Sequence, residues 1–182
     1  MKNSLFVFFR FLTVSVILVS CGNTGDGQVV KAGSENSTEN KSPLKGAIIK
    51  NDIDIEASEV KVKAAYLMTA DAQYKETNTA RVKENIFLTV ELDTGWTKHN
   101  GKTFIGASEQ ILDQNGTIIL DAQDLFADYD KEGLDAAVAK NINLSAVIDS
   151  FEPGLQTFTV KYKIWDKKGK GLVKGSYKFK VE

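Results

Sequence analysis

The sequence predicts an all-β protein whose folded part is a single antiparallel β-sandwich. Apolar and polar residues alternate with a period of two in a series of short segments, a pattern typical of strands with one buried face. Turn sequences such as Asp113-Gln114-Asn115-Gly116 separate these segments, and no long helical pattern lies between them. A chain of 182 residues that is 42% hydrophobic can bury one ordinary core.

The alternation justifies seven or eight strands. Ile53 and Ile55 stand between acidic residues, whereas Val160, Tyr162 and Ile164 alternate with lysines. The segment 86–92 is apolar on both faces at its start, and it is a stronger strand candidate than those before it. In chain order, the predicted strands are 53–56, 60–68, 86–92, 103–112, 117–120, 142–148, 158–164 and 177–181.

Two segments depart from the strand pattern. Residues 121–129 carry apolar residues at helical spacing behind Asp121, which can cap a helix. Residues 134–140 have the pattern of another short helical turn. We expect both as short helical turns on the rim of the sandwich.

The closing hairpin has a recognisable organisation. An alternating strand at 162–166 leads through an Asp- and Gly-rich turn into an aromatic-rich strand at 175–179. This arrangement resembles the closing strands of many bacterial Ig-like modules, and the resemblance implies an Ig-like sandwich. A C2-like or jelly-roll topology would give much the same pattern and stays open. The resemblance implies a fold and no function.

Residues 1–20 have the pattern of an export signal. Lys2 supplies an early positive charge, and residues 11–19 form an apolar run. Because this run is too short to cross roughly 30 Å of membrane hydrocarbon as a helix, we interpret 1–20 as a signal peptide.

The end of this segment resembles the lipobox of bacterial lipoproteins, since Leu18-Val19-Ser20 precede Cys21. The resemblance implies that Cys21 is diacylglycerylated, that the chain is cut before it and that acyl chains anchor the protein in a membrane. Gly22 stands where some inner-membrane lipoproteins have Asp, which favours the outer membrane of the cell envelope. The alternative is an ordinary secretory signal followed by a chance cysteine.

The mature chain divides into a tether and a domain. Residues 21–45 are rich in Gly, Asn, Ser, Thr, Glu and Lys, a composition that buries too little surface to fold. Residues 46–182 have a normal size for one domain. We therefore predict an acylated cysteine and flexible tether at 21–45 and the β-sandwich at 46–182.

The charge balance restricts the partners. A formal net charge of −1 lacks the basic excess of a nucleic-acid-binding protein. Acidic residues concentrate in 109–152, whereas lysines dominate 153–182. Lys161, Lys163, Lys178 and Lys180 alternate with apolar residues, so we interpret them as a solvated strand face.

An acidic stretch is similar to the opening of a calcium-binding loop. Asp128, Asp130 and Glu132 stand at alternate positions and Gly133 follows them. The closing position of such a loop would be Ala139, which has no carboxylate. We therefore keep these three residues only as weak metal candidates and predict no metal and no cofactor.

The sequence offers little for catalysis. His99 is the one histidine and Cys21 the one cysteine, so no His-Cys pair is available once Cys21 is acylated. Glycine-rich phosphate loops and nucleophile elbows are also missing from the sequence. We predict that the protein is not an enzyme; a hydrolase with two carboxylates distant in sequence is the alternative.

A predicted loop supplies the candidate ligand-binding residues. Trp96 is close in sequence to His99 and Asn100, and an exposed indole ring can stack on a sugar or anchor a protein, whereas packing in the core is the more common fate of a tryptophan. Trp165, at the end of a strand, has the same two readings of core or contact residue. The sequence thus predicts a lipid-anchored extracytoplasmic binding or structural module with a protein or glycan partner, on an undetermined face of the outer membrane.

Overall fold

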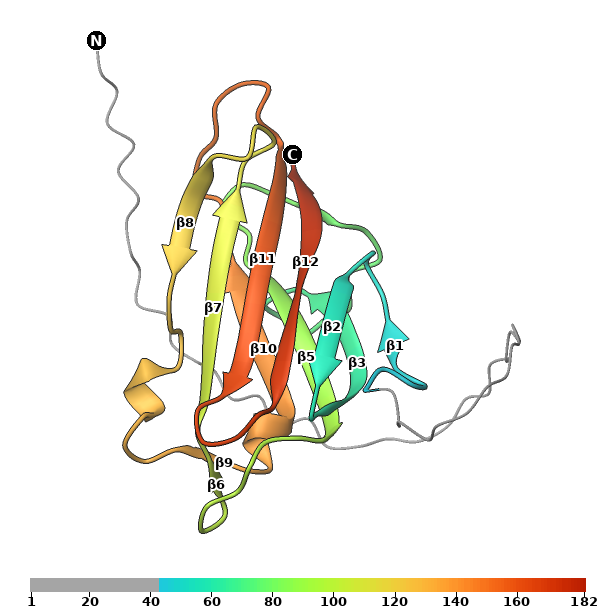
Figure 1. The fold of residues 1–182 in the computed structure, drawn as a ribbon. Coiled ribbons are helices and arrows are strands. Elements are labelled where there is room, and N and C mark those ends of the chain that lie inside the picture. Colours follow the sequence, from blue (N-terminus) through green and yellow to red (C-terminus); the bar gives the residue numbers. More distant parts are fainter. Residues whose placement is uncertain (1–42) are drawn as a thin grey trace. The chain divides into compact units, whose positions relative to one another are not determined.

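The structure is a computed structural model that describes residues 43–182. In them the chain forms an all-β sandwich of mainly antiparallel sheets (Figure 1), which confirms the predicted fold class. No helix in this part of the chain is long and apolar enough to cross a membrane. The predicted signal peptide, Cys21 and most of the predicted tether lie outside the described residues.

One sheet, here called the back sheet, has the strand order β1-β3-β5-β10. The middle strands β3 and β5 pair antiparallel, with Leu67 opposite Leu88, and β1 pairs parallel with β3. The strands are β1 (Ile48–Ile49), β3 (Lys61–Met68), β5 (Ile86–Thr94) and β10 (Asn141–Ala146).

The other sheet, here called the front sheet, has the order β2-β12-β11-β7-β8, and β4 pairs with the end of β12. Its long central strands β11 and β12 form the closing hairpin. The strands are β2 (Asp54–Ser58), β4 (Thr79–Ala80), β7 (Ile105–Leu112), β8 (Ile118–Ala122), β11 (Thr157–Asp166) and β12 (Leu172–Val181). A small ribbon of β6 (Lys102–Thr103) and β9 (Leu134–Asp135) lies outside both sheets.

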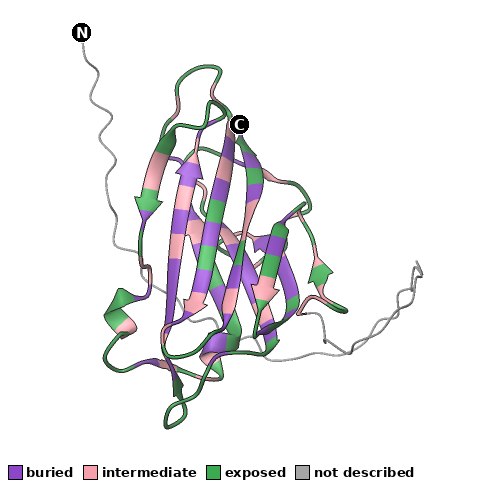
Figure 2. Ribbon diagram, viewed as in Figure 1, coloured by how far each residue is buried: buried purple, intermediate pink, exposed green. Residues whose placement is uncertain are grey.

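The core lies between the two sheets because each strand buries every second residue (Figure 2). Leu88 of β5, Val160 and Ile164 of β11 and Val181 of β12 are completely buried. Each such aliphatic side chain contributes about 1.5–3 kcal/mol through removal from water. The alternation read from the sequence is therefore the alternation that fills the core.

The rim turns are shorter than their sequence pattern. They are single 3-10 turns, η1 (Ala127–Tyr129) and η2 (Val138–Lys140). Asp121 does not cap a helix, because Asp121 and Ala122 belong to β8 and pair with β7. Short helical turns on the rim are confirmed, but the helical spacing at 121–129 is only partly used.

The folded contacts begin earlier than residue 46. The carbonyl of Pro43 accepts a hydrogen bond from the backbone N–H of Val62 at 3.0 Å. Leu44 packs against the core. Pro43 and Leu44, which the sequence pattern assigns to the tether, therefore make contacts with the sandwich; an isolated Leu in a polar stretch has no periodic pattern that predicts such a contact.

Candidate functional site

The outer face of the front sheet is set by the side-chain alternation of β11. Tyr162 and Ile164 point into the core, so Lys161, Lys163 and Trp165 point outward. Strand pairing then places Gln110 beside Lys161, Ser108 beside Lys163 and Gly106 beside Trp165 on β7. From position 161 to position 165 there are four residue steps along the strand, so this double row is roughly 13 Å long.

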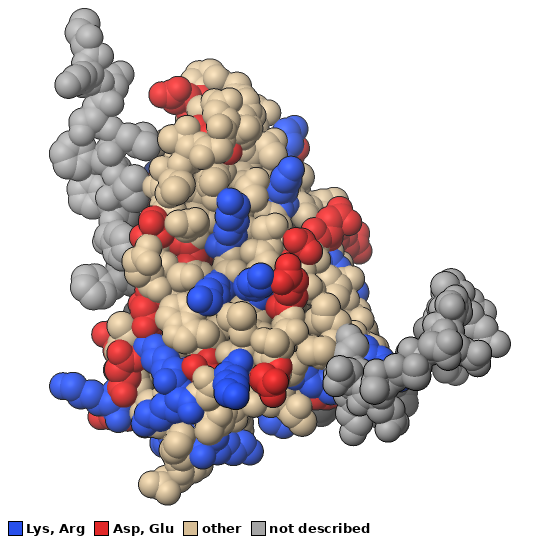
Figure 3. All heavy atoms as spheres, in the orientation of Figure 1, with Lys and Arg blue, Asp and Glu red and all other residues tan. Residues whose placement is uncertain are grey.

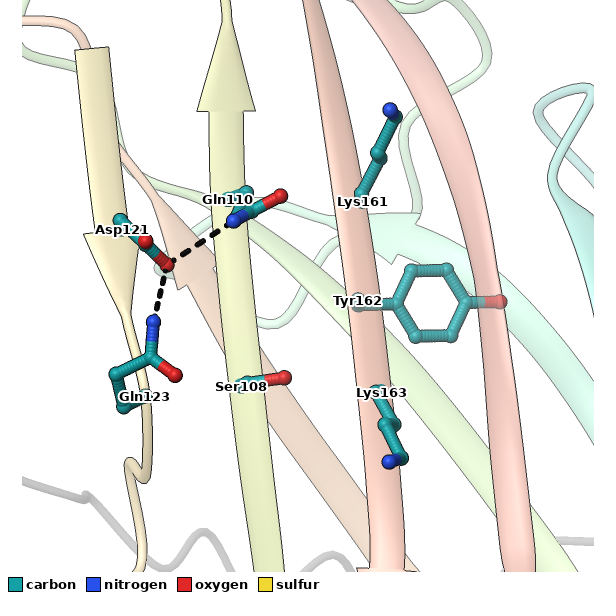
Figure 4. Close-up of a pocket in the computed structure, with 7 residues that line it drawn as sticks. All are labelled: Ser108, Gln110, Asp121, Gln123, Lys161, Tyr162 and Lys163. Atoms are coloured by element: carbon teal, nitrogen blue, oxygen red, sulfur yellow. Dashed lines mark hydrogen bonds between the residues drawn. The ribbon is translucent and has the colours of Figure 1, made fainter. Parts of the chain in front are cut away.

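An open groove of about 250 Å³ lies on this face (Figure 4). Polar side chains from β7, β8 and β11 line it, and the Tyr162 ring points away from it, across β12. We define the outer-face site as the polar side chains that line the groove together with Trp165 at the end of the row. The groove-lining side chains are Ser108, Gln110, Asp121, Gln123, Lys161 and Lys163.

Two amides hold the Asp121 carboxylate at one side of the groove. The side-chain N–H groups of Gln110 and Gln123 donate to the same oxygen, Oδ1, at 3.2 and 2.7 Å. Both bonds appear as dashed lines in Figure 4. Charge-assisted hydrogen bonds of this kind fix the carboxylate and orient both amide groups.

Trp165 lies over Gly106 on the neighbouring strand. A Cβ atom at position 106 would overlap the six-membered part of the indole and come within 2.8 Å of its Nε1. Gly106 therefore lets one surface of the ring lie close to the sheet, and Gly106 is buried although its position faces outward. Trp165 itself is only half-buried, and the Lys163 ammonium lies 5.5 Å from its ring centre.

The outer-face site has a positive charge excess. Figure 3 shows basic side chains on the face formed by β7, β11 and β12. The ion pairs among residues 43–182 do not include Lys161, Lys163 or Lys178. In contrast, Lys174 on β12 binds Glu56 at 2.8 Å. The predicted lysine face is thus real, and part of it has no acidic partner in the described domain.

A buried carboxylic acid lies behind the groove. Glu109 stands between Ser108 and Gln110 on β7, but its side chain faces the core and is 2% exposed. Burial raises the pKa of its carboxyl to about 8. Within the described residues, its Oε1 and the hydroxyl of Tyr177 have no hydrogen-bond partner. A ligand on the outer face would not reach this acid, because the sheet separates them.

Of the two readings of Trp96, the structure supports the core residue and contradicts the exposed contact residue. Its ring is 6% exposed, and its indole N–H donates to the carbonyl of Ala139 at 2.8 Å. Gly171 lies directly against the ring. Trp96 is therefore a core residue that ties the loop after β5 to the rim turn η2, and its surface is not available to a ligand.

His99 and Asn100 are exposed, so the structure separates them from Trp96. Asn100 and Gly101 have φ values of 52° and 78°, the left-handed backbone that an Asn-Gly turn requires. His99 contacts Phe104 edge-on, with ring centres 6.2 Å apart. The turn chemistry expected from the sequence is present, but no exposed indole accompanies it.

The weak metal candidates do not converge. Asp128 and Glu132 are exposed, and Asp130 forms an ion pair with Lys167. Among residues 43–182 there is no group of three His, Cys, Asp or Glu side chains placed to hold a metal ion. The carboxylates of Asp128, Asp130 and Glu132 alternate in the sequence, but they do not come together around one point in the structure.

Most residues of the outer-face site have no direct signal in the sequence. Ser108, Gln110, Asp121 and Gln123 are ordinary polar residues until strand pairing puts them side by side. The available signal was indirect: Trp165 follows two outward lysines on an alternating strand. Only the β7–β11 register reveals that a glycine lies under it.

The chain matches no protein-family model and no curated protein. Among solved structures it is similar to the crystal structure of the C-terminal domain of Wzt. That similarity has a TM-score of 0.47 and 9% sequence identity, and it covers 77% of this chain and 84% of that one. The outer-face site described above comes from the strand pairing of this chain alone.

Proposed function

We propose that the protein is a lipid-anchored, extracytoplasmic binding module without catalytic activity, and that it binds through the outer-face site. One observation carries the binding part: Trp165 and two lysines without acidic partners share an exposed sheet face with ordered amides. Side chains held ready in this way lose little conformational freedom when a ligand binds. The anchor part rests on the resemblance of residues 18–21 to a lipobox.

The lysines themselves can report whether the site is occupied. Amine-reactive labelling of intact cells, compared with the purified full-length protein, measures the accessibility of each lysine. Protection of Lys161 and Lys163 in cells is expected, whereas the exposed Lys98 and Lys131 should react equally in both samples. Equal reactivity of all four lysines would contradict binding at the outer-face site, whatever the ligand.

The anchor has a separate test. Cys21→Ser should move the protein from the membrane fraction to the soluble fraction or leave the precursor unprocessed. The mature wild-type protein should carry acyl mass at Cys21 in mass spectrometry. An unmodified Cys21 in the mature chain would contradict the anchor and leave the binding proposal to the labelling experiment.

A further inference from the structure

We infer that the ligand of the outer-face site is a saccharide that carries negatively charged groups, such as carboxylates or phosphates. This inference rests on the proposed function, because it names the class of ligand for the same site. Three features of the face carry it: the orientation of one aromatic ring, the mixture of hydrogen-bonding groups and the charge.

The ring orientation is the first feature. Because the Trp165 indole lies over Gly106, one of its surfaces is used by the protein. Trp165 is only half-buried, and the Lys163 ammonium lies over its ring at 5.5 Å from the ring centre, so a sugar that stacks on the exposed part of the indole would also meet this ammonium. The C–H groups on one face of a sugar ring stack on such an indole surface, whereas a protein anchor is usually an aromatic group set in an apolar surround. Here the surround is polar.

The hydrogen-bonding groups are the second feature. Gln110 and Gln123 each use an N–H for Asp121. Each amide also has a carbonyl oxygen and a second N–H, and the Ser108 hydroxyl can both donate and accept. A surface that mixes donors and acceptors along roughly 13 Å of sheet suits a row of hydroxyl groups. A short oligosaccharide presents such a row.

The charge is the third feature. Lys161 and Lys163 line the groove without acidic partners in the described domain, whereas Lys174 on the next strand has Glu56. Lys178, which lies beside Thr159 on the same face, also lacks one. Anionic groups on the sugar would supply the missing partners, and charge complementarity would select that sugar over a neutral one.

The test uses the full-length protein in detergent and three probes. Oligogalacturonate is the anionic saccharide, a malto-oligosaccharide of equal length is the neutral one, and phosphatidylglycerol vesicles present anionic groups without sugar. Titration calorimetry should give measurable binding for oligogalacturonate, at least about tenfold weaker binding for the neutral probe and a loss of affinity with salt. The vesicles should not compete with oligogalacturonate.

Variants connect the binding to the site. Trp165→Ala should weaken oligogalacturonate binding about tenfold or more, and Lys161→Gln with Lys163→Gln should remove the preference for the anionic probe. Lys174→Gln is the matched control, because this lysine lies on the same sheet face but is already paired; it should change affinity less than about twofold. If Trp165→Ala does not fold, Gln123→Ala, on the exposed edge, should also weaken binding.

Two results would overturn the inference. One is equal affinity for the anionic and neutral saccharides, or binding that the Trp165, Gln123 and double-lysine variants leave unchanged. The other is competition by vesicles that the double-lysine variant abolishes, which would identify a membrane surface as the ligand. In either case, protection of Lys161 and Lys163 in cells would still support the proposed function, so the two failures are distinguishable.

Discussion

The hydroxyl group of Tyr162 donates a hydrogen bond to the backbone carbonyl of Asp54 at 3.2 Å. Tyr162 lies on β11 and Asp54 on β2, and β12 runs between them. The ring can cross β12 because the residue beneath it is Gly175, which pairs with Tyr162 on one side and Ile55 on the other. One tyrosine therefore joins three strands of the front sheet.

A methyl group at position 175 should break this arrangement. In Gly175→Ala, the added Cβ would overlap the Asp54 carbonyl and lie 2.7 Å from the Tyr162 hydroxyl. We expect the free energy of unfolding to fall by roughly 2 kcal/mol, from overpacking and the lost hydrogen bond. Urea denaturation measures this change. Ser176→Ala, at the next position, is the control and should remain within about 0.5 kcal/mol of wild type.

The buried Glu109 should make stability depend on pH. Burial raises its pKa from 4.5 to about 8, so between these values the folded protein holds a proton that the unfolded chain has released. The contribution of Glu109 to the free energy of unfolding should therefore be greatest below pH 4.5. It should fall by on the order of 1 kcal/mol per pH unit between pH 4.5 and about pH 8. Denaturation curves at several pH values measure this slope.

Glu109→Gln should reduce that slope, because an amide replaces the carboxyl without a titrating proton. At pH 8 the variant should be more stable than wild type, and the difference should shrink toward pH 5. Glu132→Gln, at an exposed position, is the control and should leave the slope unchanged. A wild-type slope that persists in Glu109→Gln would assign the pH dependence to another group.

Trp96 should affect stability and leave binding alone. Trp96→Phe removes the indole N–H that donates to Ala139 and leaves that buried carbonyl without its partner. A loss of about 1–3 kcal/mol in unfolding free energy is expected. The affinity for oligogalacturonate should stay within about twofold of wild type, because Trp96 does not line the outer-face site. A tenfold loss of affinity in a folded Trp96→Phe variant would contradict this prediction and show that the loop of Trp96 takes part in binding.

Metal removal should not change the melting temperature. Asp130 already forms an ion pair with Lys167, and Asp128 and Glu132 lie exposed without converging on one point. Thermal melts in EDTA and in calcium should therefore coincide. A lower melting temperature in EDTA that calcium restores would show that these acids do form a site.

The sequence predicted the strands well where burial alone decides the pattern. Tyr162 and Ile164 alternate with lysines because one face of β11 is core and the other is solvent, and period-two alternation records that difference. The rim was harder to predict. Residues 121–129 have apolar residues at helical spacing, but the backbone N–H of Leu125 donates to the carbonyl of Ala107 on β7 and that of Phe126 to the Asp124 carboxylate, so no helix forms at these two residues. Such contacts have no local sequence signature.

The candidate site was predicted less well, for a geometric reason. Exposure of Trp96 depends on whether Ala139, distant in sequence, comes to meet its indole. The position of Trp165 depends on the register that brings Gly106 beneath it. Both depend on contacts between residues that are distant in sequence, and such contacts leave no local pattern in a single sequence.

The two-residue strand β1 is the weakly held end of the domain under a pulling force. A pull transmitted from residues before 43 would first load the contacts of Pro43 and Leu44 and then β1, where Ile48 and Ile49 pair with Ala64 and Ala65. The last strand, β12, is instead held by β11, β2 and β4. Under tension β1 should therefore separate from β3 first, while the front sheet, which carries the groove, keeps its structure. Unpairing of β1 would then lengthen the N-terminal connection without disturbing the outer-face site.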